Sequence, residues 1–142
     1  MRALIVEDDP ISIQILEHVL SAFGRCDVAV NGRQALDAFR RAADQASPYD
    51  LICMDIMMPE LSGQEALRRI RELEKQAGIP SDNAVKVVMT TALSTAREAD
   101  DALFKGGACA YFVKPIHLDN FIHELKRLKV ISDSSRADTN DG

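Results

Sequence analysis

Five apolar runs alternate along the chain with segments in which apolar residues recur every three or four positions. The runs are short and lie at residues 3–6, 26–30, 51–54, 85–89 and 109–113. Four of them are almost continuously apolar, as expected of strands that are covered on both faces, whereas 26–30 alternates and suits an edge strand. The alternation predicts an α/β fold of order (βα)5, with a doubly wound, five-stranded parallel sheet and helices on both of its faces.

The intervening segments carry the start signals and the apolar stripes of helices. Asp9 can cap free backbone amides, and Pro10 suits the first helical turn. A second helix is expected after Asn31, and Ser62 and Thr95 each precede a glutamate by three residues, which is the capping-box pattern. The apolar positions expected to face the sheet are Ile13, Leu16, Val19, Leu20 and Phe23 in the first helix, Ala35, Leu36, Phe39 and Ala43 in the second, Ala66, Leu67, Ile70, Leu73 and Ala77 in the third, and Leu118, Phe121, Ile122, Leu125 and Leu128 in the last.

Composition narrows the class of protein. The 142 residues fit one domain, which we place at residues 1–131, and the polar stretch 132–142 is expected to be a disordered tail. We expect neither a membrane span nor a signal peptide, and hence a cytoplasmic location, because the apolar runs are short and acidic residues interrupt the first. The net charge of −5 argues against nucleic acid as a direct partner. Three widely spaced cysteines predict neither a disulfide nor a zinc site.

Reactive side chains follow four of the five predicted strands. In a parallel sheet these positions share one edge, where ligands bind near the switch in strand order. Each residue alone has an ordinary structural explanation, such as a helix cap or a turn residue, but their joint placement predicts a functional site. The residues are Glu7, Asp8 and Asp9 after the first strand, Asp55 after the third, Thr90 and Thr91 after the fourth, and Lys114 with Pro115 after the fifth.

The chemistry of this group points to a divalent cation and a phosphoryl group. Three close carboxylates repel one another, and a bound cation would offset the repulsion. Oxygen ligands in small number suit Mg²⁺, which keeps several waters and often bridges to phosphate. An ionised Asp55 could then act as nucleophile and form an aspartyl phosphate, while Lys114 neutralises charge on the phosphoryl oxygens and Thr91 donates to one of them.

Four sequence blocks carry a family resemblance. Residues 4–10, 54–59, 89–92 and 107–115 resemble the signature blocks of response-regulator receiver domains of two-component signalling, in particular the single-domain, chemotaxis-regulator-like kind. The similarity extends over about residues 2–130, nearly the whole predicted domain.

The resemblance implies a role for each residue of the site. Asp55 is the expected phosphoacceptor, Asp8 the direct metal ligand, and Glu7 a ligand that acts mainly through water. Asp55 itself and the backbone carbonyl of Met57 complete the metal site. Because that ligand is a carbonyl, the Met57 side chain is free to vary.

The resemblance also implies a switch. Thr91 and Lys114 are expected to close onto the phosphoryl group, and Tyr111 to turn inward as Thr91 moves. The Lys114–Pro115 peptide bond is expected to be cis, which would aim the lysine into the pocket.

The function implied is that of a phosphorylated switch and not of an enzyme acting on other substrates. A histidine kinase or phosphotransfer protein would supply the phosphoryl group, and the face of the fourth helix, fifth strand and fifth helix would signal to an unknown downstream protein. Because no output domain follows in the sequence, we expect a stand-alone regulator. Self-association through the same face stays open.

Two details depart from the common pattern. Asp55 and Thr91 are 91 − 55 = 36 residues apart, which is long for a receiver, and we place the extra residues at 74–84 as a surface insertion without chemistry. Met57 and Leu93 are apolar where other family members carry polar groups that help to orient the attacking water. We therefore expect slow self-dephosphorylation.

Three other functions share part of this pattern. A pseudo-receiver that binds partners without chemistry would keep the fold, but the intact acidic and basic residues argue against it. A haloacid-dehalogenase-type phosphatase would need its nucleophile after the first strand in a D-x-D-x-T pattern, which residues 7–10 lack. A flavodoxin-like cofactor protein has the same layer order but needs a phosphate-binding loop where this chain has acidic residues, and fold alone does not give function.

Overall fold

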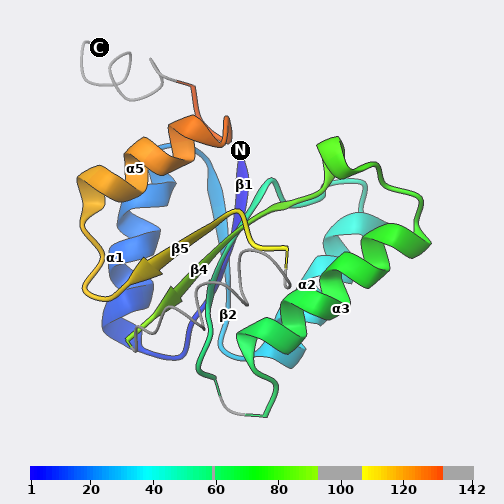
Figure 1. The fold of residues 1–142 in the computed structure, drawn as a ribbon, viewed down its shortest axis with the longest axis horizontal. Coiled ribbons are helices and arrows are strands. Elements are labelled where there is room, and N and C mark those ends of the chain that lie inside the picture. Colours follow the sequence, from blue (N-terminus) through cyan, green and yellow to red (C-terminus); the bar gives the residue numbers. More distant parts are fainter. Residues whose placement is uncertain (59, 93–106, 133–142) are drawn as a thin grey trace.

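The structure is a computed structural model that describes residues 1–58, 60–92 and 107–132 (Figure 1). The helix expected from Thr95 onward and residues 133–142 of the predicted tail lie outside these ranges. In chain order the elements are β1 (Arg2–Val6), α1 (Pro10–Ser21), β2 (Arg25–Ala29), α2 (Gly32–Asp44), β3 (Leu51–Asp55), α3 (Gly63–Gln76), a 3₁₀ turn at Ser81–Asn83, β4 (Lys86–Thr91), β5 (Ala110–Val113) and α5 (Leu118–Arg127).

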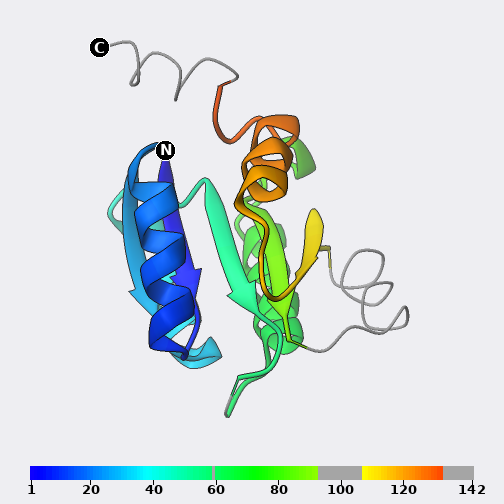
Figure 2. The ribbon, with the colours of Figure 1, turned by 90° about the vertical axis from the view of Figure 1, so that its left-hand side faces the viewer.

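The strands form one parallel sheet in the order β2-β1-β3-β4-β5. The α/β prediction is confirmed, and so is the edge position of β2. Helices α1 and α5 cover one face of the sheet, and α2 and α3 cover the other (Figure 1). The carboxyl ends of β1 and β3, between which the strand order switches, point to the same end of the sheet (Figure 2). That is where a doubly wound fold binds its ligands.

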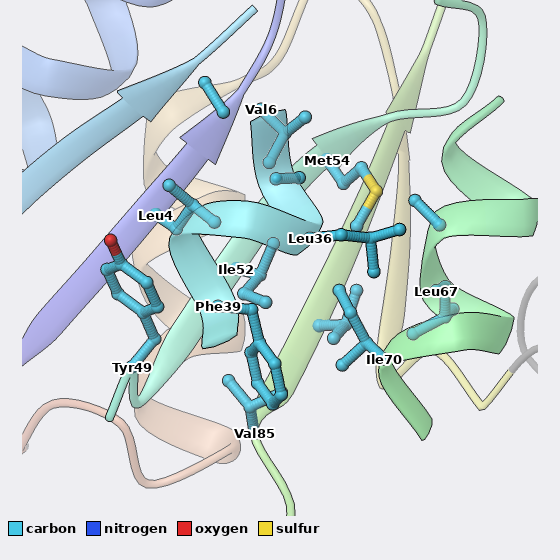
Figure 3. Close-up of a cluster of buried hydrophobic side chains, with 14 of the residues drawn as sticks. Leu4, Val6, Leu36, Phe39, Tyr49, Ile52, Met54, Leu67, Ile70 and Val85 are labelled. Carbon is cyan, nitrogen blue, oxygen red and sulfur yellow. The ribbon is translucent and has the colours of Figure 1, made fainter. Parts of the chain in front are cut away.

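Each sheet face is packed into its own apolar core because successive residues of a strand point to opposite sides. Leu4 of β1 faces α2 and α3, and its neighbour Ile5 faces α1 and α5. Figure 3 shows the first of these cores, in which Leu36 and Phe39 of α2 meet Ile70 of α3 over the sheet. Among the described residues, no helix is long and apolar enough to cross a membrane.

The helix starts at Asp9 and Ser62 are confirmed. The Asp9 carboxylate accepts hydrogen bonds from the backbone N–H groups of Ile11 and Ser12, at 3.4 and 3.3 Å. The Ser62 hydroxyl accepts one from the N–H of Glu65 at 3.2 Å. Both side chains satisfy amides that have no partner within the helix.

Three predicted core positions were wrong, and one of them is Leu118, the first residue of α5, which is 38% exposed. Ala43 is exposed and Ala42 is buried in its place: both lie on the side of Phe39 in the last turn of α2, and only Ala42 is covered there. Ala77 is also exposed, since it forms the C-cap of α3. The buried position near that end of α3 belongs to Glu74.

Candidate functional site

The candidate site is assembled at the carboxyl ends of the central strands. Glu7 and Asp8 follow β1, and Asp55 ends the neighbouring strand β3. One carboxylate oxygen from each of the three residues lies within 4.8 Å of the other two. Glu7 and Asp55 are buried and Asp8 is exposed, so the acidic group opens to solvent on the Asp8 side.

Lys114 brings a positive charge into this acidic group from the end of β5. Its Nζ donates to Oε1 of Glu7 at 2.5 Å and to Oδ2 of Asp55 at 3.3 Å. Its backbone N–H donates to the carbonyl of Thr91 at 2.7 Å, which ties the ends of β5 and β4 together. The peptide bond between Lys114 and Pro115 is cis.

Backbone amides hold the carboxylates in place. Oε2 of Glu7 accepts from the N–H groups of Asp8 and Asp9, at 3.1 and 3.2 Å. Oδ1 of Asp55 accepts from the N–H of Met57 at 3.1 Å, which leaves Oδ2 toward Lys114. The carboxylates of Glu7 and Asp55 are therefore each oriented by backbone donors on their own loop and by the ammonium of Lys114.

Charge balance suits a divalent cation. Three carboxylates face one ammonium, which leaves two negative charges without a counter-ion in the group. All ligand atoms offered are oxygens, the donor type that Mg²⁺ prefers. The residues present therefore fit a magnesium ion, with Glu7, Asp8 and Asp55 as the side chains that could hold it.

Burial and charge set the protonation of the central pair. Burial, reinforced by the charge of Asp55, raises the pKa of the Glu7 carboxyl, against the hydrogen bond from Lys114, which lowers it. For Lys114, burial alone would lower the pKa, but the hydrogen bond to Glu7 and the charge of Asp55 outweigh it and raise the pKa. The ammonium therefore stays charged around neutral pH.

Thr91 ends β4, and Tyr111 lies on the neighbouring strand β5. Thr91 is fully buried at the end of β4, where it pairs in register with Val113. Tyr111 is half-buried and packs against the core formed with α2 and α3. The structure thus brings Glu7, Asp8, Asp55 and Lys114 together and sets Thr91 at the end of an adjacent strand. Leu93 lies outside the described residues.

Gly63 fits the family resemblance in the sequence, and the structure gives the steric reason for it. Its N–H donates to the carbonyl of Ile56 at 2.9 Å, so the start of α3 lies against the loop that follows Asp55. A Cβ at this position would overlap the carbonyl oxygen of Asp55 and lie 2.9 Å from Cα of Ile56. The absence of a side chain at Gly63 therefore fixes how closely α3 approaches the candidate phosphoacceptor.

The sequence pattern did not reveal an apolar surface beside the site. Ile11 and Ile15 of α1 are 68% and 45% exposed, and with Pro115 and Ile116 they line a groove of about 410 Å³ that includes Lys114. The available signal was the presence of two isoleucines off the apolar stripe of the first helix. Exposed apolar residues clustered next to a reactive group are typical of a protein-binding surface.

Residues 3–126 match the family described as the response regulator receiver domain. Since this match covers most of the chain, the protein belongs to that family and is a receiver domain of two-component signalling.

Relatives and solved structures agree with this assignment. The two-component response regulator ORR41 of Oryza sativa subsp. japonica is 34% identical over 117 residues, which are 82% of this chain and 84% of that protein. The hybrid signal transduction histidine kinase L of Dictyostelium discoideum is 34% identical over 116 residues, which are 81% of this chain but 6% of the kinase. The chain thus spans a small part of some of its relatives, 8% in the case of the probable histidine kinase 2 of Oryza sativa.

Two solved structures are similar in fold and sequence. One is the receiver domain of the Saccharomyces cerevisiae response regulator Ssk1, crystallised with the histidine phosphotransfer protein Ypd1, with a TM-score of 0.77, 30% identity, and coverage of 94% of this chain and 93% of that one. The other is the receiver domain of the sensor histidine kinase PA1611 from Pseudomonas aeruginosa PAO1, with a magnesium ion in its active-site cleft. It has a TM-score of 0.72, 28% identity, and coverage of 89% and 95%.

Proposed function

We propose that this chain accepts a phosphoryl group on Asp55 from a histidine kinase or a histidine phosphotransfer protein, in a Mg²⁺-dependent reaction. The observation that carries the proposal is the contact of Lys114 with both Glu7 and Asp55 within a carboxylate group that fits a divalent cation. The structures of similar receivers with a phosphotransfer protein and with magnesium support it.

In this proposal each residue of the site has its own role in phosphoryl transfer. Oδ of Asp55 attacks phosphorus, the bond from phosphorus to the donor histidine nitrogen breaks, and the nitrogen keeps the electron pair. Lys114 neutralises charge on the phosphoryl oxygens, and Glu7 holds the ammonium in place. Mg²⁺ held by Glu7, Asp8, Asp55 and the carbonyl of Met57 would supply further charge neutralisation. The chain modifies only itself.

Phosphorylated Asp55 then changes the shape of the surface around β5. A phosphoryl group adds charge and hydrogen-bond acceptors at Asp55, and Thr91 moves toward it together with Lys114. Tyr111 turns into the space that Thr91 leaves. The surface of β4, β5 and α5, with the helix expected from Thr95, would then bind a separate downstream protein in the cytoplasm or a second copy of this chain, as a shift between two populated states.

Phosphorylation of Asp55 is tested with acetyl phosphate as donor. We expect intact-mass spectrometry to show one added phosphoryl group in the presence of Mg²⁺, and none when EDTA removes the metal. Asp55→Asn should abolish the gain, whereas Asp50→Asn, at the opposite end of β3, should keep it. A folded wild-type chain that gains no mass from acetyl phosphate or from phosphorylated phosphotransfer proteins would instead be a pseudo-receiver.

The apolar groove at Ile11 and Ile15 is expected to dock the protein that carries the phosphohistidine. It adjoins Lys114, so a helix seated there would bring its histidine to Asp55. Ile11→Asp should slow transfer from a phosphorylated phosphotransfer protein by about tenfold or more, the cost of a charge placed in an apolar contact. Phosphorylation by acetyl phosphate should stay unchanged. Equal slowing with both donors would show that the groove supports the phosphorylation reaction itself and does not dock the phosphotransfer protein.

Met57 is expected to make the phosphorylated form long-lived. Its side chain is apolar and 55% exposed at the mouth of the site, so it offers no hydrogen bond to an attacking water. Met57→Asn should speed phosphoryl loss by up to about tenfold, a fraction of what a positioned general base achieves. The decay of the phosphorylated mass after removal of acetyl phosphate measures this rate, with Met57→Leu as control. An unchanged rate in the asparagine variant would contradict the prediction.

A further inference from the structure

A buried carboxylate near the far end of α3 joins that helix to the start of β4. Glu74 is 4% exposed, and both of its oxygens are occupied. Oε2 accepts from the backbone N–H of Val85 at 2.7 Å, and Oε1 accepts from Nη1 of Arg71 at 2.7 Å. A buried charge is tolerated only when it is paired and hydrogen-bonded in this way.

Arg71 extends the connection to the chain that leads into β5. Its Nη2 and Nε both donate to the carbonyl oxygen of Gly107, at 2.8 and 3.3 Å. Gly107 has a φ of +80°, and a Cβ there would lie 3.1 Å from Nε of Arg71. Glycine therefore suits this position for two reasons: it adopts the positive φ, and it leaves room for the guanidinium to approach.

The contact matters because it holds the amino end of β5, a strand at the edge of the sheet whose Phe112 also packs against Phe121 of α5. Among the strands that the structure describes, this four-residue edge strand pairs only with β4. Its amino end is held by the Arg71–Gly107 contact and by the hydrogen bond from Cys109 to Val87, at 2.7 Å. Its carboxyl end delivers Lys114 to the candidate site, seven positions after Gly107.

We propose that Arg71, oriented by Glu74, is a positioning residue that fixes the amino end of β5 so that Lys114 and Tyr111 occupy their functional places. This inference rests on the proposed phosphorylation of Asp55. Without the guanidinium, β5 would still pair with β4 but would sample displaced positions. Part of the preorganisation that lets Lys114 receive a phosphoryl group would be lost.

The chain offers a matched control on the same helix. Arg68, one turn before Arg71, is 64% exposed and pairs with Glu65 on the outer surface of α3. Arg68→Ala removes the same charge and a similar volume without touching β4 or β5. Arg71→Lys keeps the charge but cannot reach Glu74 and Gly107 together, because an ammonium is a point donor and a guanidinium is a planar fork.

The experiment uses the full chain labelled with 3-fluorotyrosine. The protein has two tyrosines and no tryptophan, so ¹⁹F NMR gives one resonance for Tyr111 and one for Tyr49, which Tyr49→Phe assigns. Mg²⁺ with beryllofluoride, a mimic of the phosphoryl group, is titrated into wild type and variants well below their melting temperatures. The titration yields both the position of the Tyr111 resonance and an apparent affinity.

For Arg71→Ala we expect the affinity for beryllofluoride to fall about three- to tenfold, the usual range for residues that couple two parts of a fold. The Tyr111 resonance should shift or broaden while that of Tyr49 stays in place. Arg71→Lys should give an intermediate affinity and an intermediate change in the Tyr111 resonance. Arg68→Ala should match wild type in both readouts.

Wild-type affinity and an unchanged Tyr111 resonance in Arg71→Ala would overturn the positioning role, whatever the loss in melting temperature. If that variant does not fold, Arg71→Lys and Glu74→Gln decide by the same two readouts. Failure of the wild type to bind beryllofluoride would overturn the proposed function as well, so the two failures are distinguishable.

Discussion

Replacing Lys114 with alanine slows the phosphorylation of Asp55 by acetyl phosphate by about two to three orders of magnitude, the usual cost of removing one preorganised charged donor. The reason is that Lys114 supplies the ammonium that contacts both Glu7 and Asp55. Without this ammonium, the phosphoryl oxygens approach the three carboxylates with one positive charge fewer nearby. The rate is measured by intact mass over time at fixed Mg²⁺ concentration.

The same substitution is expected to strengthen Mg²⁺ binding. Removal of a positive charge beside Glu7 and Asp55 takes away repulsion toward a cation, and the gain in affinity can be measured by calorimetry. Lys86→Ala, at the opposite end of β4, is the matched control and should change neither quantity. Parallel loss of metal binding and phosphorylation in Lys114→Ala would contradict the assigned role, because it would indicate a collapsed site.

Introducing a single methyl group at Gly63 lowers the free energy of unfolding by about 1 to 3 kcal/mol and also slows phosphorylation of Asp55. The added Cβ would overlap the carbonyl of Asp55 and crowd Cα of Ile56, and both are backbone atoms that cannot rotate away. Either α3 or the loop after β3 must therefore move, and the Asp55 carboxylate moves with it. Urea unfolding measures the first effect and the acetyl phosphate reaction the second.

Gly78→Ala separates stability from function. Gly78 has a φ of +74° and nothing within 4 Å of an added Cβ, so alanine there is strained but causes no clash. The substitution should lower the free energy of unfolding by about 1 to 2 kcal/mol and leave the phosphorylation rate unchanged. If Gly63→Ala kept the wild-type rate as well, the close approach of α3 would be irrelevant to the placement of Asp55.

Local signals in the sequence were enough for the order of the elements that the structure describes. The continuous apolar runs gave the parallel strands, and Asp9 and Ser62 marked helix starts, because capping and the strand period depend on neighbours in the chain. The reactive group could also be predicted, since every strand of a parallel sheet ends at the same edge. Glu7 and Lys114 are 107 positions apart, yet both could be assigned to that edge from strand ends alone.

Other features depend on which segments the fold brings together. The sequence places residues 74–84 in a surface insertion, but the structure begins this segment with the buried carboxylate of Glu74. The contact from Arg71 to Gly107 spans 36 positions, and a pattern on one helix gives no sign of it.

The alternation of strands and helices and the residue types at the reactive edge follow from periodicity and chain order, so they could be predicted from the sequence. The folded structure was needed to see which charges are buried, how closely Gly63 approaches Asp55 and which isoleucines remain exposed. Those properties depend on distances between segments that are remote in sequence, and such distances are set by the packing of whole elements against one another.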